Sequence, residues 1–356
     1  MPLLRLTLER LRELAACRQD STAQPRESDL DREPIVDLAS LRNPHGCGPK
    51  ARAVLAHGSA AEGEACDLKA KIAHRFGLAQ GQVVLGDGAN DVLGRIARAF
   101  LTAGDSSLYS QYAFARYALA TRECDARAIE VRAQDDEGHD LNAMLAAIEA
   151  DTRLVWIASP NNPTGMIVRP GDMLEFLEHC PKRVLVVLDE AGIEYVPRER
   201  QLDTLGWLRQ FPNLIFVRTF SNAYGLDRHP VGYALANPEV AARIGQQTVS
   251  QLAQAAACAA LDDEEFLRES QRANRAGMKQ LTDALAKLGI PHIPGYGNFV
   301  TFRCGDAVML DRFMRERGVR VCPLTDYGLA DSVRVAIGLP QHNARFIEVL
   351  EEAMNG

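Results

Sequence analysis

The sequence predicts an α/β fold, with a large domain built on a mostly parallel seven-stranded sheet covered by helices and a smaller α+β domain after it. Two observations lead to this expectation. Between residues 51 and 236, short apolar runs alternate with longer stretches of helical period, which is typical of βαβ units. After Pro238 the chain becomes a long helical region rich in Ala, Gln and Glu, and shorter strand and helix patterns follow it.

Seven apolar runs are predicted as strands, because they are rich in residues that suit a sheet covered by helices on both faces. They are residues 83–85, 107–109, 128–131, 154–158, 184–188, 214–218 and 232–235. Stretches of helical period lie between most of them, at residues 67–76, 89–101, 141–150 and 171–179. This alternation makes a largely parallel sheet the simplest arrangement.

The C-terminal part is expected to form the smaller domain. Its helical region, residues 240–288, has a predicted break at Asp262 and Asp263. The later elements are strands at 298–302, 319–322 and 333–337 and helices at 309–317 and 343–354. We expect a large domain over 50–260, a small domain over 261–356, and an N-terminal segment over 1–49 that packs with the small domain. In that segment, residues 3–16 predict an amphipathic helix and residues 18–33 a polar surface stretch.

Composition and charge exclude several classes of protein. With 47% hydrophobic and 24% charged residues the chain is not disordered. A net charge of −7 and a pI near 5.7 give no overall positive field for nucleic acid or an anionic membrane. No apolar run approaches the roughly 18 residues of a membrane-spanning helix. The eight cysteines form neither a C-x-x-C pair nor a metal-binding cluster, so we expect reduced thiols in a cytoplasmic protein.

Two polar strings follow predicted strands directly. Residues 159–165, Ser-Pro-Asn-Asn-Pro-Thr-Gly, predict a tight loop at the carboxyl end of a strand, where α/β sheets bind ligands, although a surface turn would have the same composition. Asp189 comes at the end of the strand at 184–188 and is expected either to cap a helix or to bind a cationic group.

Two more strings have the character of an anion site. Residues 218–226, Arg-Thr-Phe-Ser-Asn-Ala-Tyr-Gly-Leu, follow another strand, and their hydroxyls either cradle a phosphate or form a turn. Residues 86–91, Gly-Asp-Gly-Ala-Asn-Asp, precede a helix, whose first N–H groups and dipole attract anions.

Together, in this order, these strings resemble the fold-type I pyridoxal-phosphate (PLP) aminotransferases, specifically the histidinol-phosphate aminotransferase branch. The resemblance extends over nearly the whole chain, through residues 38–40, 43–46, 104–105, 298–300 and 332–338. It implies that Asp189 pairs with the pyridine nitrogen, that Asn162 bonds the phenolic oxygen, and that Phe114 stacks on the ring. Arg334, with Asn162, is expected to bind an anionic group of the substrate. The residues expected at the cofactor phosphate are Ala89, Asn90, Thr219 and Ser221.

The sequence departs from the family at the Schiff-base lysine, whose position is occupied by Asn222. An amide forms no internal aldimine and does not move a proton between substrate and cofactor. None of the six lysines lies in a string near this site. Conventional transamination is therefore not expected.

Other family contacts are also missing. The family's phosphate-binding arginine falls on Pro230, and three further family residues are replaced by Gly192, Ala60 and Cys322. Each lost charge-assisted contact is worth roughly 1.5–3 kcal/mol, which predicts weak cofactor binding. Two new residues in the same loop are candidates to compensate: Arg228 for anion binding and His229 as an acid or base, if the loop is not merely exposed.

From these departures we expect a diverged biosynthetic enzyme that acts on an amino-acid-like or other carboxylate substrate without an internal aldimine. It would use Asn222, Asp189 and His229 as catalytic groups and either no cofactor or non-covalent pyridoxal or pyridoxamine phosphate. One alternative is a non-catalytic pseudoenzyme or partner subunit of an intact aminotransferase. The other is an ordinary PLP-dependent aminotransferase of class I and II. The resemblance implies a homodimer, whereas a partner subunit of an intact aminotransferase would form a heterodimer with it.

Overall fold

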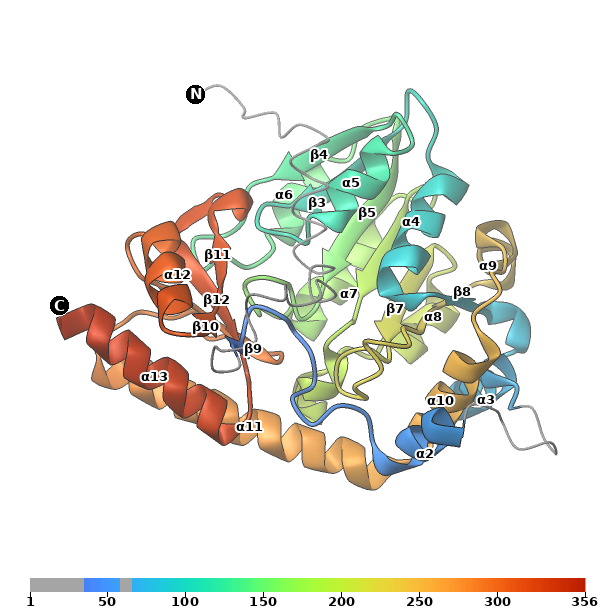
Figure 1. Cartoon of the computed structure of the whole chain (residues 1–356). Helices are drawn as coiled ribbons and strands as arrows, with labels where there is room; N and C mark the ends of the chain where they lie inside the picture. Colours follow the sequence, from blue (N-terminus) through green and yellow to red (C-terminus); the bar gives the residue numbers. More distant parts are fainter. Residues whose placement is uncertain (1–34, 58–65, 356) are drawn as a thin grey trace.

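A mixed seven-stranded sheet forms the larger part of the protein in the computed structural model, which describes residues 35–57 and 66–355 (Figure 1). The strands are β2 (Val83–Gly86), β3 (Ser106–Ser110), β4 (Arg127–Val131), β5 (Thr152–Ala158), β6 (Leu185–Asp189), β7 (Leu214–Thr219) and β8 (Gly232–Ala236). Their order is β2-β8-β7-β6-β5-β3-β4, and β8 runs antiparallel to both of its neighbours. The remaining pairs are parallel, so the seven predicted strands and the mostly parallel sheet are confirmed.

Helices cover both faces of this sheet because successive strand residues point to opposite sides. In β5, Val155 and Ile157 belong to one core cluster, whereas Leu154 and Trp156 belong to the other. The first cluster is completed by α2 (Pro49–His57), α3 (Leu68–Phe76), α6 (Leu141–Ala146), α7 (Pro170–His179), α8 (Thr204–Gln210) and α10 (Gln251–Leu261). The second is completed by α4 (Gly88–Phe100), α5 (Arg116–Arg122) and α9 (Pro238–Ile244). The short 3₁₀ turns are η3 (Gln80–Gln82), η4 (Ile193–Tyr195) and η5 (Arg198–Arg200).

A three-stranded antiparallel sheet, ordered β11-β12-β9, forms the smaller part. Its elements are β9 (Phe299–Arg303), α12 (Ala307–Glu316), β11 (Cys322–Leu324), η6 (Thr325–Tyr327), β12 (Leu329–Ala336) and α13 (Pro340–Asn355). The predicted strand at 319–322 is split. Its first half, β10 (Val319–Arg320), pairs with the N-terminal strand β1 (Val36–Asp37), while its last residue begins β11 and pairs with β12. The long helix α11 (Glu264–Lys287) runs between the two parts (Figure 1).

The helical region predicted over 240–288 consists of three helices. The break at Asp262 and Asp263 is confirmed, and Asp263 caps α11 by accepting a hydrogen bond from Phe266 N. A second break at 245–250 was not predicted; there Gly245 takes a φ of +78° and Ser250 caps α10. The predicted helix at 141–150 ends early, at Ala146. The expectations for residues 3–16 and 18–33 lie outside the described residues.

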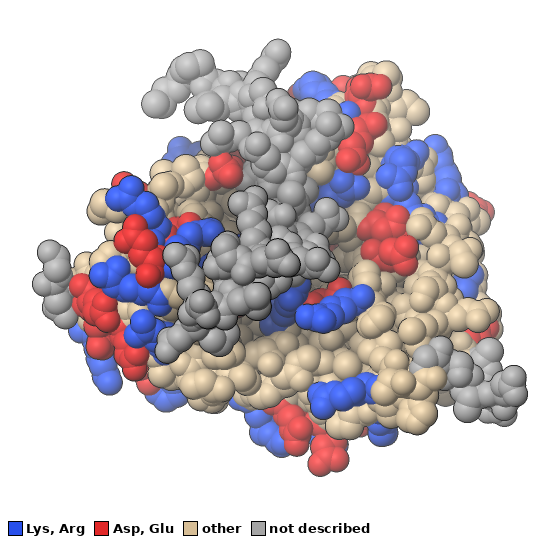
Figure 2. Space-filling model, in the orientation of Figure 1, with Lys and Arg blue, Asp and Glu red and all other residues tan. Residues whose placement is uncertain are grey.

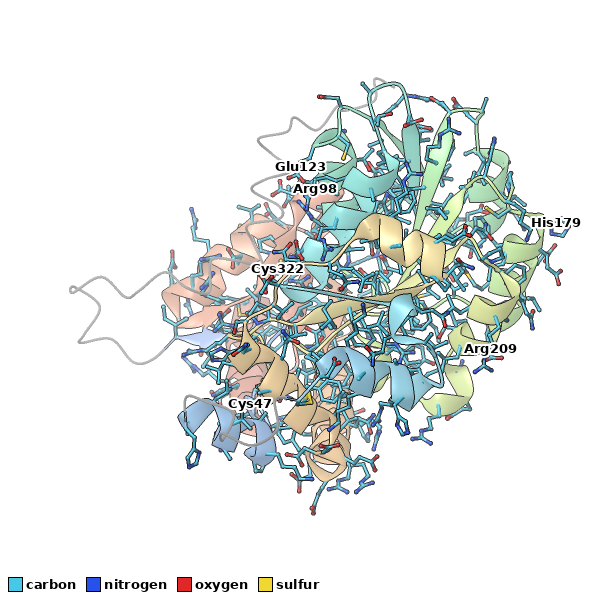
Figure 3. All side chains as sticks on the ribbon, turned by 90° about the vertical axis from the view of Figure 1, so that its right-hand side faces the viewer. Cys47, Arg98, Glu123, His179, Arg209 and Cys322 are labelled. Atoms are coloured by element: carbon cyan, nitrogen blue, oxygen red, sulfur yellow. A yellow bond between two sulfur atoms is a disulfide. The ribbon has the colours of Figure 1, made fainter. Side chains whose placement is uncertain are left out.

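The cysteine prediction is wrong for one pair. Cys66 and Cys258, which come from the segment before α3 and from α10, form a disulfide. Figure 3 labels two of the free cysteines, Cys47 before α2 and Cys322 in β11.

On the described part of the face in Figure 2, basic and acidic side chains are intermixed. Among the described residues, no helix is long and apolar enough to span a membrane.

Candidate active site

Three loops meet where neighbouring parallel strands of the large sheet end. Ala158, the last residue of β5, is in register with Asp189, the last residue of β6, which is in turn in register with Val217 of β7. The strings predicted to bind ligands, 159–165 and 218–226, and the residues after Asp189 therefore continue side by side beyond this edge of the sheet. This is the edge at which open α/β sheets bind ligands.

Asp189 is held rigidly at this edge. Only 6% of the residue is exposed, and its carboxylate accepts hydrogen bonds from the Tyr117 hydroxyl to Oδ2 at 2.9 Å and from Ala191 N to Oδ1 at 3.0 Å. The Tyr117 ring stacks on Trp156 with centroids 5.4 Å apart, and Phe114 packs edge-on against Tyr117 at 5.8 Å. The sequence analysis missed Tyr117. No local pattern pointed to Tyr117, because Phe114 precedes α5 and the contact of Tyr117 with Asp189 joins residues 72 positions apart.

Arg334 of β12 and Asn162 meet across the two parts of the protein. Arg334 is 4% exposed; Nη1 donates to Asn162 Oδ1 and Nη2 to the carbonyl of Ala39 at 3.0 Å. Arg334 Nε and Asn162 Nδ2 are buried donors that have no hydrogen-bond partner within residues 35–57 and 66–355. Buried donors are almost always paired, so this pair is suited to an anionic ligand that accepts from both. Cys322 lies opposite Arg334 in the neighbouring strand.

A pocket of about 250 Å³ opens beside the first turn of α4. One wall is the helix N-terminus, and the other is the loop after β7, where Thr219 Oγ1 lies 3.1 Å from Ser221 Oγ. The start of β8 packs directly against the start of α4. Gly232 makes this possible, because a Cβ there would lie 2.3 Å from the backbone carbonyl carbon of Gly88. The pocket is lined by Ser40, Leu41, Arg42, Asp87, Gly88, Ala89, Asn90, Thr219, Ser221, Asn222, Asp227 and Pro230. Helix N–H groups and hydroxyls form a donor set that fits a phosphate group.

The structure brings some of the predicted site residues together and leaves others apart. The four residues expected at the cofactor phosphate, Ala89, Asn90, Thr219 and Ser221, line this one pocket together with Asn222. The remaining predicted residues, Phe114, Asn162, Asp189, Arg228, His229 and Arg334, are not part of its lining. Arg228 is exposed on the loop after β7, next to a half-buried His229. The roles expected for those two residues stay predictions.

Asn222 joins the pocket to the Asp189 loop. Its Nδ2 donates a hydrogen bond to the carbonyl of Ala191, whose N–H bonds Asp189. None of the six lysines is among the residues that line the pocket in the described part of the chain. The residues present thus fit the ring nitrogen and phosphate of the cofactor, whereas residue 222 supplies an amide and no amine. Ala60, also named above, lies outside the described residues.

Two acidic side chains with raised pKa values, Glu190 and Glu194, follow strand β6. Glu190, which follows Asp189, forms a 2.9 Å ion pair with Arg218 of β7, and burial raises the pKa of the Glu190 carboxyl. Burial also raises the pKa of Glu194 to about 7. The Glu190–Arg218 ion pair connects the residue after β6 to β7, and removal of either partner would leave a buried charge unpaired.

Comparison with known proteins identifies relatives over nearly the whole chain. The family model "Aminotransferase class I and II" matches residues 57–350. Histidinol-phosphate aminotransferase 1 of Dechloromonas aromatica is 50% identical over 94% of both chains. Histidinol-phosphate aminotransferase 2 of Ralstonia nicotianae is 45% identical over 92% of this chain and 91% of its own.

Solved structures have the same fold. The histidinol-phosphate aminotransferase of Sinorhizobium meliloti in complex with pyridoxal-5′-phosphate gives a TM-score of 0.81 at 25% identity, covering 94% of this chain and 96% of that chain. A crystal structure of a protein from Erwinia carotovora atroseptica gives a TM-score of 0.83 at 23% identity, covering 89% of this chain and 95% of that chain. The predicted aminotransferase fold type I is confirmed.

These similarities contradict the main functional prediction. Three relatives named histidinol-phosphate aminotransferases align with 92–94% of this chain at 45–50% identity. The comparisons therefore favour the alternative of an ordinary PLP-dependent aminotransferase. The expectations of a PLP-independent enzyme and of a cofactor bound only non-covalently are corrected on the same finding. The error came from giving one substituted position more weight than similarity along the entire chain.

Proposed function

Because the chain belongs to the aminotransferase class I and II family, we propose that it is a PLP-dependent aminotransferase. The observation that carries the proposal is its 50% identity to a histidinol-phosphate aminotransferase over 94% of both chains. The donor set at the carboxyl edge of the sheet supports it. Function on a shared fold depends on the site, so the roles of individual residues are proposed one by one.

In this proposal Asp189 faces the ring nitrogen. Its carboxylate, held by Tyr117 and by Ala191 N, accepts a hydrogen bond from the protonated nitrogen and keeps it protonated. When bound, PLP supplies an electron sink for the electrons of a breaking bond at the substrate's α-carbon. Phe114 packs against the ring face, and Asn162 bonds the ring's oxygen substituent. Residues 88–90 at the start of α4, with Thr219 and Ser221, bind the phosphate group.

Arg334 is proposed to bind the anionic group of the substrate. The guanidinium is buried and anchored by Ala39 and Asn162, and its Nε has no partner in the described part of the chain. A planar donor fork in this state suits a carboxylate or a phosphate. From the names of the relatives, we propose histidinol phosphate as the amino donor and a 2-oxo acid as the acceptor.

We further infer that Asn222 occupies the position of the family's lysine, since it follows Ser221 in the same string. An amide nitrogen is not nucleophilic enough to attack an aldehyde. A covalent link to the cofactor therefore requires an amine from outside the described pocket lining. The point of attachment is thus the sharpest test of the proposal.

The experiment has two readouts. Protein incubated with PLP is reduced with borohydride, and peptide mass spectrometry is expected to find a pyridoxyl group on a lysine. In parallel, histidinol phosphate and 2-oxoglutarate are expected to give glutamate. Asp189→Asn should lower turnover roughly 10²-fold, because the ring nitrogen loses its charged partner. Asp203→Asn is the matched control, since this exposed residue only caps α8 and asparagine caps equally well.

Failure of both readouts, no pyridoxyl peptide and no glutamate, would contradict the proposal. If only the Asn222→Lys variant gives a pyridoxyl peptide and glutamate, residue 222 limits the reaction.

We also propose that the protein is a cytoplasmic homodimer. Light scattering on the purified protein is then expected to give twice the 39.0 kDa chain mass.

A further inference from the structure

One cationic side chain that the sequence analysis did not single out lines the pocket beside the start of α4. Pro230, which stands at the position of the family's phosphate-binding arginine, lines the pocket but has neither a charge nor an N–H. Arg228, the expected replacement, is exposed and is not part of the lining. Among the described residues that line the pocket, Arg42 is the only lysine, arginine or histidine.

Arg42 reaches the pocket from the N-terminal segment and is fixed on the far wall. Its Nε lies 3.0 Å from Oδ2 of Asp227, a residue of the loop after β7. The two side chains are 32% and 23% exposed, so this ion pair lies at the rim of the pocket and is partly shielded from water. Arg42 therefore connects the N-terminal segment to the loop that carries Thr219 and Ser221.

The backbone on both sides of Arg42 is anchored. The carbonyl of Leu41 accepts a 2.8 Å hydrogen bond from Asn298 Nδ2. The side-chain amide of Asn43 donates to the carbonyl of Ala223 at 2.9 Å and to Ser270 Oγ at 2.8 Å. Because both neighbours are tied to other parts of the fold, the position of the Arg42 backbone is well defined. Preorganisation of this kind is what an anion-binding arginine requires.

From these contacts, and resting on the proposed function, the geometry points to Arg42 as the residue that binds the cofactor's phosphate group in place of the arginine that Pro230 replaces. The α4 N-terminus and the hydroxyls of Thr219 and Ser221 supply neutral donors, and Arg42 supplies the positive charge. Asp227 acts as a positioning residue, because its carboxylate orients the guanidinium through Nε.

The test compares two ligands that differ only in the phosphate group, pyridoxine 5′-phosphate and pyridoxine. Neither has an aldehyde, so their binding, measured by calorimetry, does not depend on covalent attachment or on turnover. We expect wild-type protein to prefer the phosphorylated ligand. Arg42→Gln should reduce that preference about ten- to a hundredfold, the effect of one charge-assisted contact. Arg42→Lys, which keeps the charge, should recover part of it.

Arg320→Gln is the matched control. Arg320 is also 32% exposed and also pairs with an aspartate of the N-terminal segment, Asp37, but it does not line the pocket. Its substitution should leave the preference for pyridoxine 5′-phosphate unchanged. An unchanged preference in Arg42→Gln, a loss only in Arg228→Gln, or a wild-type protein with no preference would each overturn the assignment. Loss of transamination with the preference intact would instead count against the proposed function alone.

Discussion

The Tyr117 hydroxyl donates a 2.9 Å hydrogen bond to Oδ2 of Asp189, so an aromatic side chain from α5 holds the carboxylate at the end of β6. The Tyr117 ring lies nearly parallel to Trp156, at an interplanar angle of 3°. Stacking fixes the ring, and the ring fixes the hydroxyl. The orientation of Asp189 thus depends on packing within the core as well as on its own strand.

Removal of this hydroxyl should destabilise the fold without disturbing its packing. We expect Tyr117→Phe to lower the free energy of unfolding by about 1–3 kcal/mol, because a buried carboxylate loses a donor while the stacked ring remains. Urea denaturation measures the change. Tyr296→Phe is the control: that half-buried tyrosine has no hydrogen bond to its hydroxyl among the described contacts, and less than about 0.5 kcal/mol is expected. Equal effects of the two substitutions would contradict this role of Tyr117.

Gly225 should be irreplaceable where the pocket loop crosses the N-terminal segment. Its φ is +69°, and a Cβ would lie 1.9 Å from the carbonyl oxygen of Gly46. We expect Gly225→Ala to cost about 2–5 kcal/mol, from left-handed strain of about 1–2 and steric overlap of about 1–3. Gly46 has nearly the same φ, +68°, with nothing within 4 Å, so Gly46→Ala should cost only the strain. Thermal denaturation of the two variants separates the backbone strain, which both share, from the steric overlap, which only Gly225→Ala has.

The Cys66–Cys258 disulfide should stabilise the protein measurably. It joins residues separated by 192 positions, and closing a loop that long restricts the unfolded chain strongly. Reduction should therefore lower the free energy of unfolding by about 2–5 kcal/mol, measured by urea denaturation with and without reductant. The double variant Cys66→Ala, Cys258→Ala should not respond to reductant. Recovery of both cysteines as free thiols after alkylation of the native protein would rule the bond out.

His139 should make stability depend on pH. Burial lowers its pKa to about 4, and Nε2 lies 2.9 Å from the carbonyl oxygen of Ala158. Between pH 4 and about 6.5 the unfolded chain binds a proton that the folded protein does not, so stability falls as the pH falls through this range. The loss should reach about 3 kcal/mol at pH 4.

The His139→Gln variant isolates this contribution, because glutamine keeps a hydrogen-bonding group but does not titrate in this range. The difference in unfolding free energy between wild type and variant should change by about 3 kcal/mol from pH 6.5 to pH 4. A difference that is the same at both pH values would mean that His139 titrates normally in the folded protein.

Local patterns predicted the elements well but not their ends or interruptions. All seven strands of the large sheet follow from apolar runs between turn residues, since burial on both faces requires such runs. The break in the helical region at 245–250 was missed, because it depends on Gly245 adopting φ +78°. The split of the strand at 319–322 was missed as well. It exists only because β1, from the other end of the chain, pairs with Val319 and Arg320.

The sequence by itself determined the strand and helix pattern, the family resemblance and the residues of the main strings, because each is written in neighbouring positions. The tertiary structure alone decided that Arg42 meets Asp227, that Tyr117 holds Asp189 and that Cys66 joins Cys258. Each of those pairs is far apart in the chain, and no local periodicity encodes which distant segments become neighbours when the sheet assembles in the order β2-β8-β7-β6-β5-β3-β4.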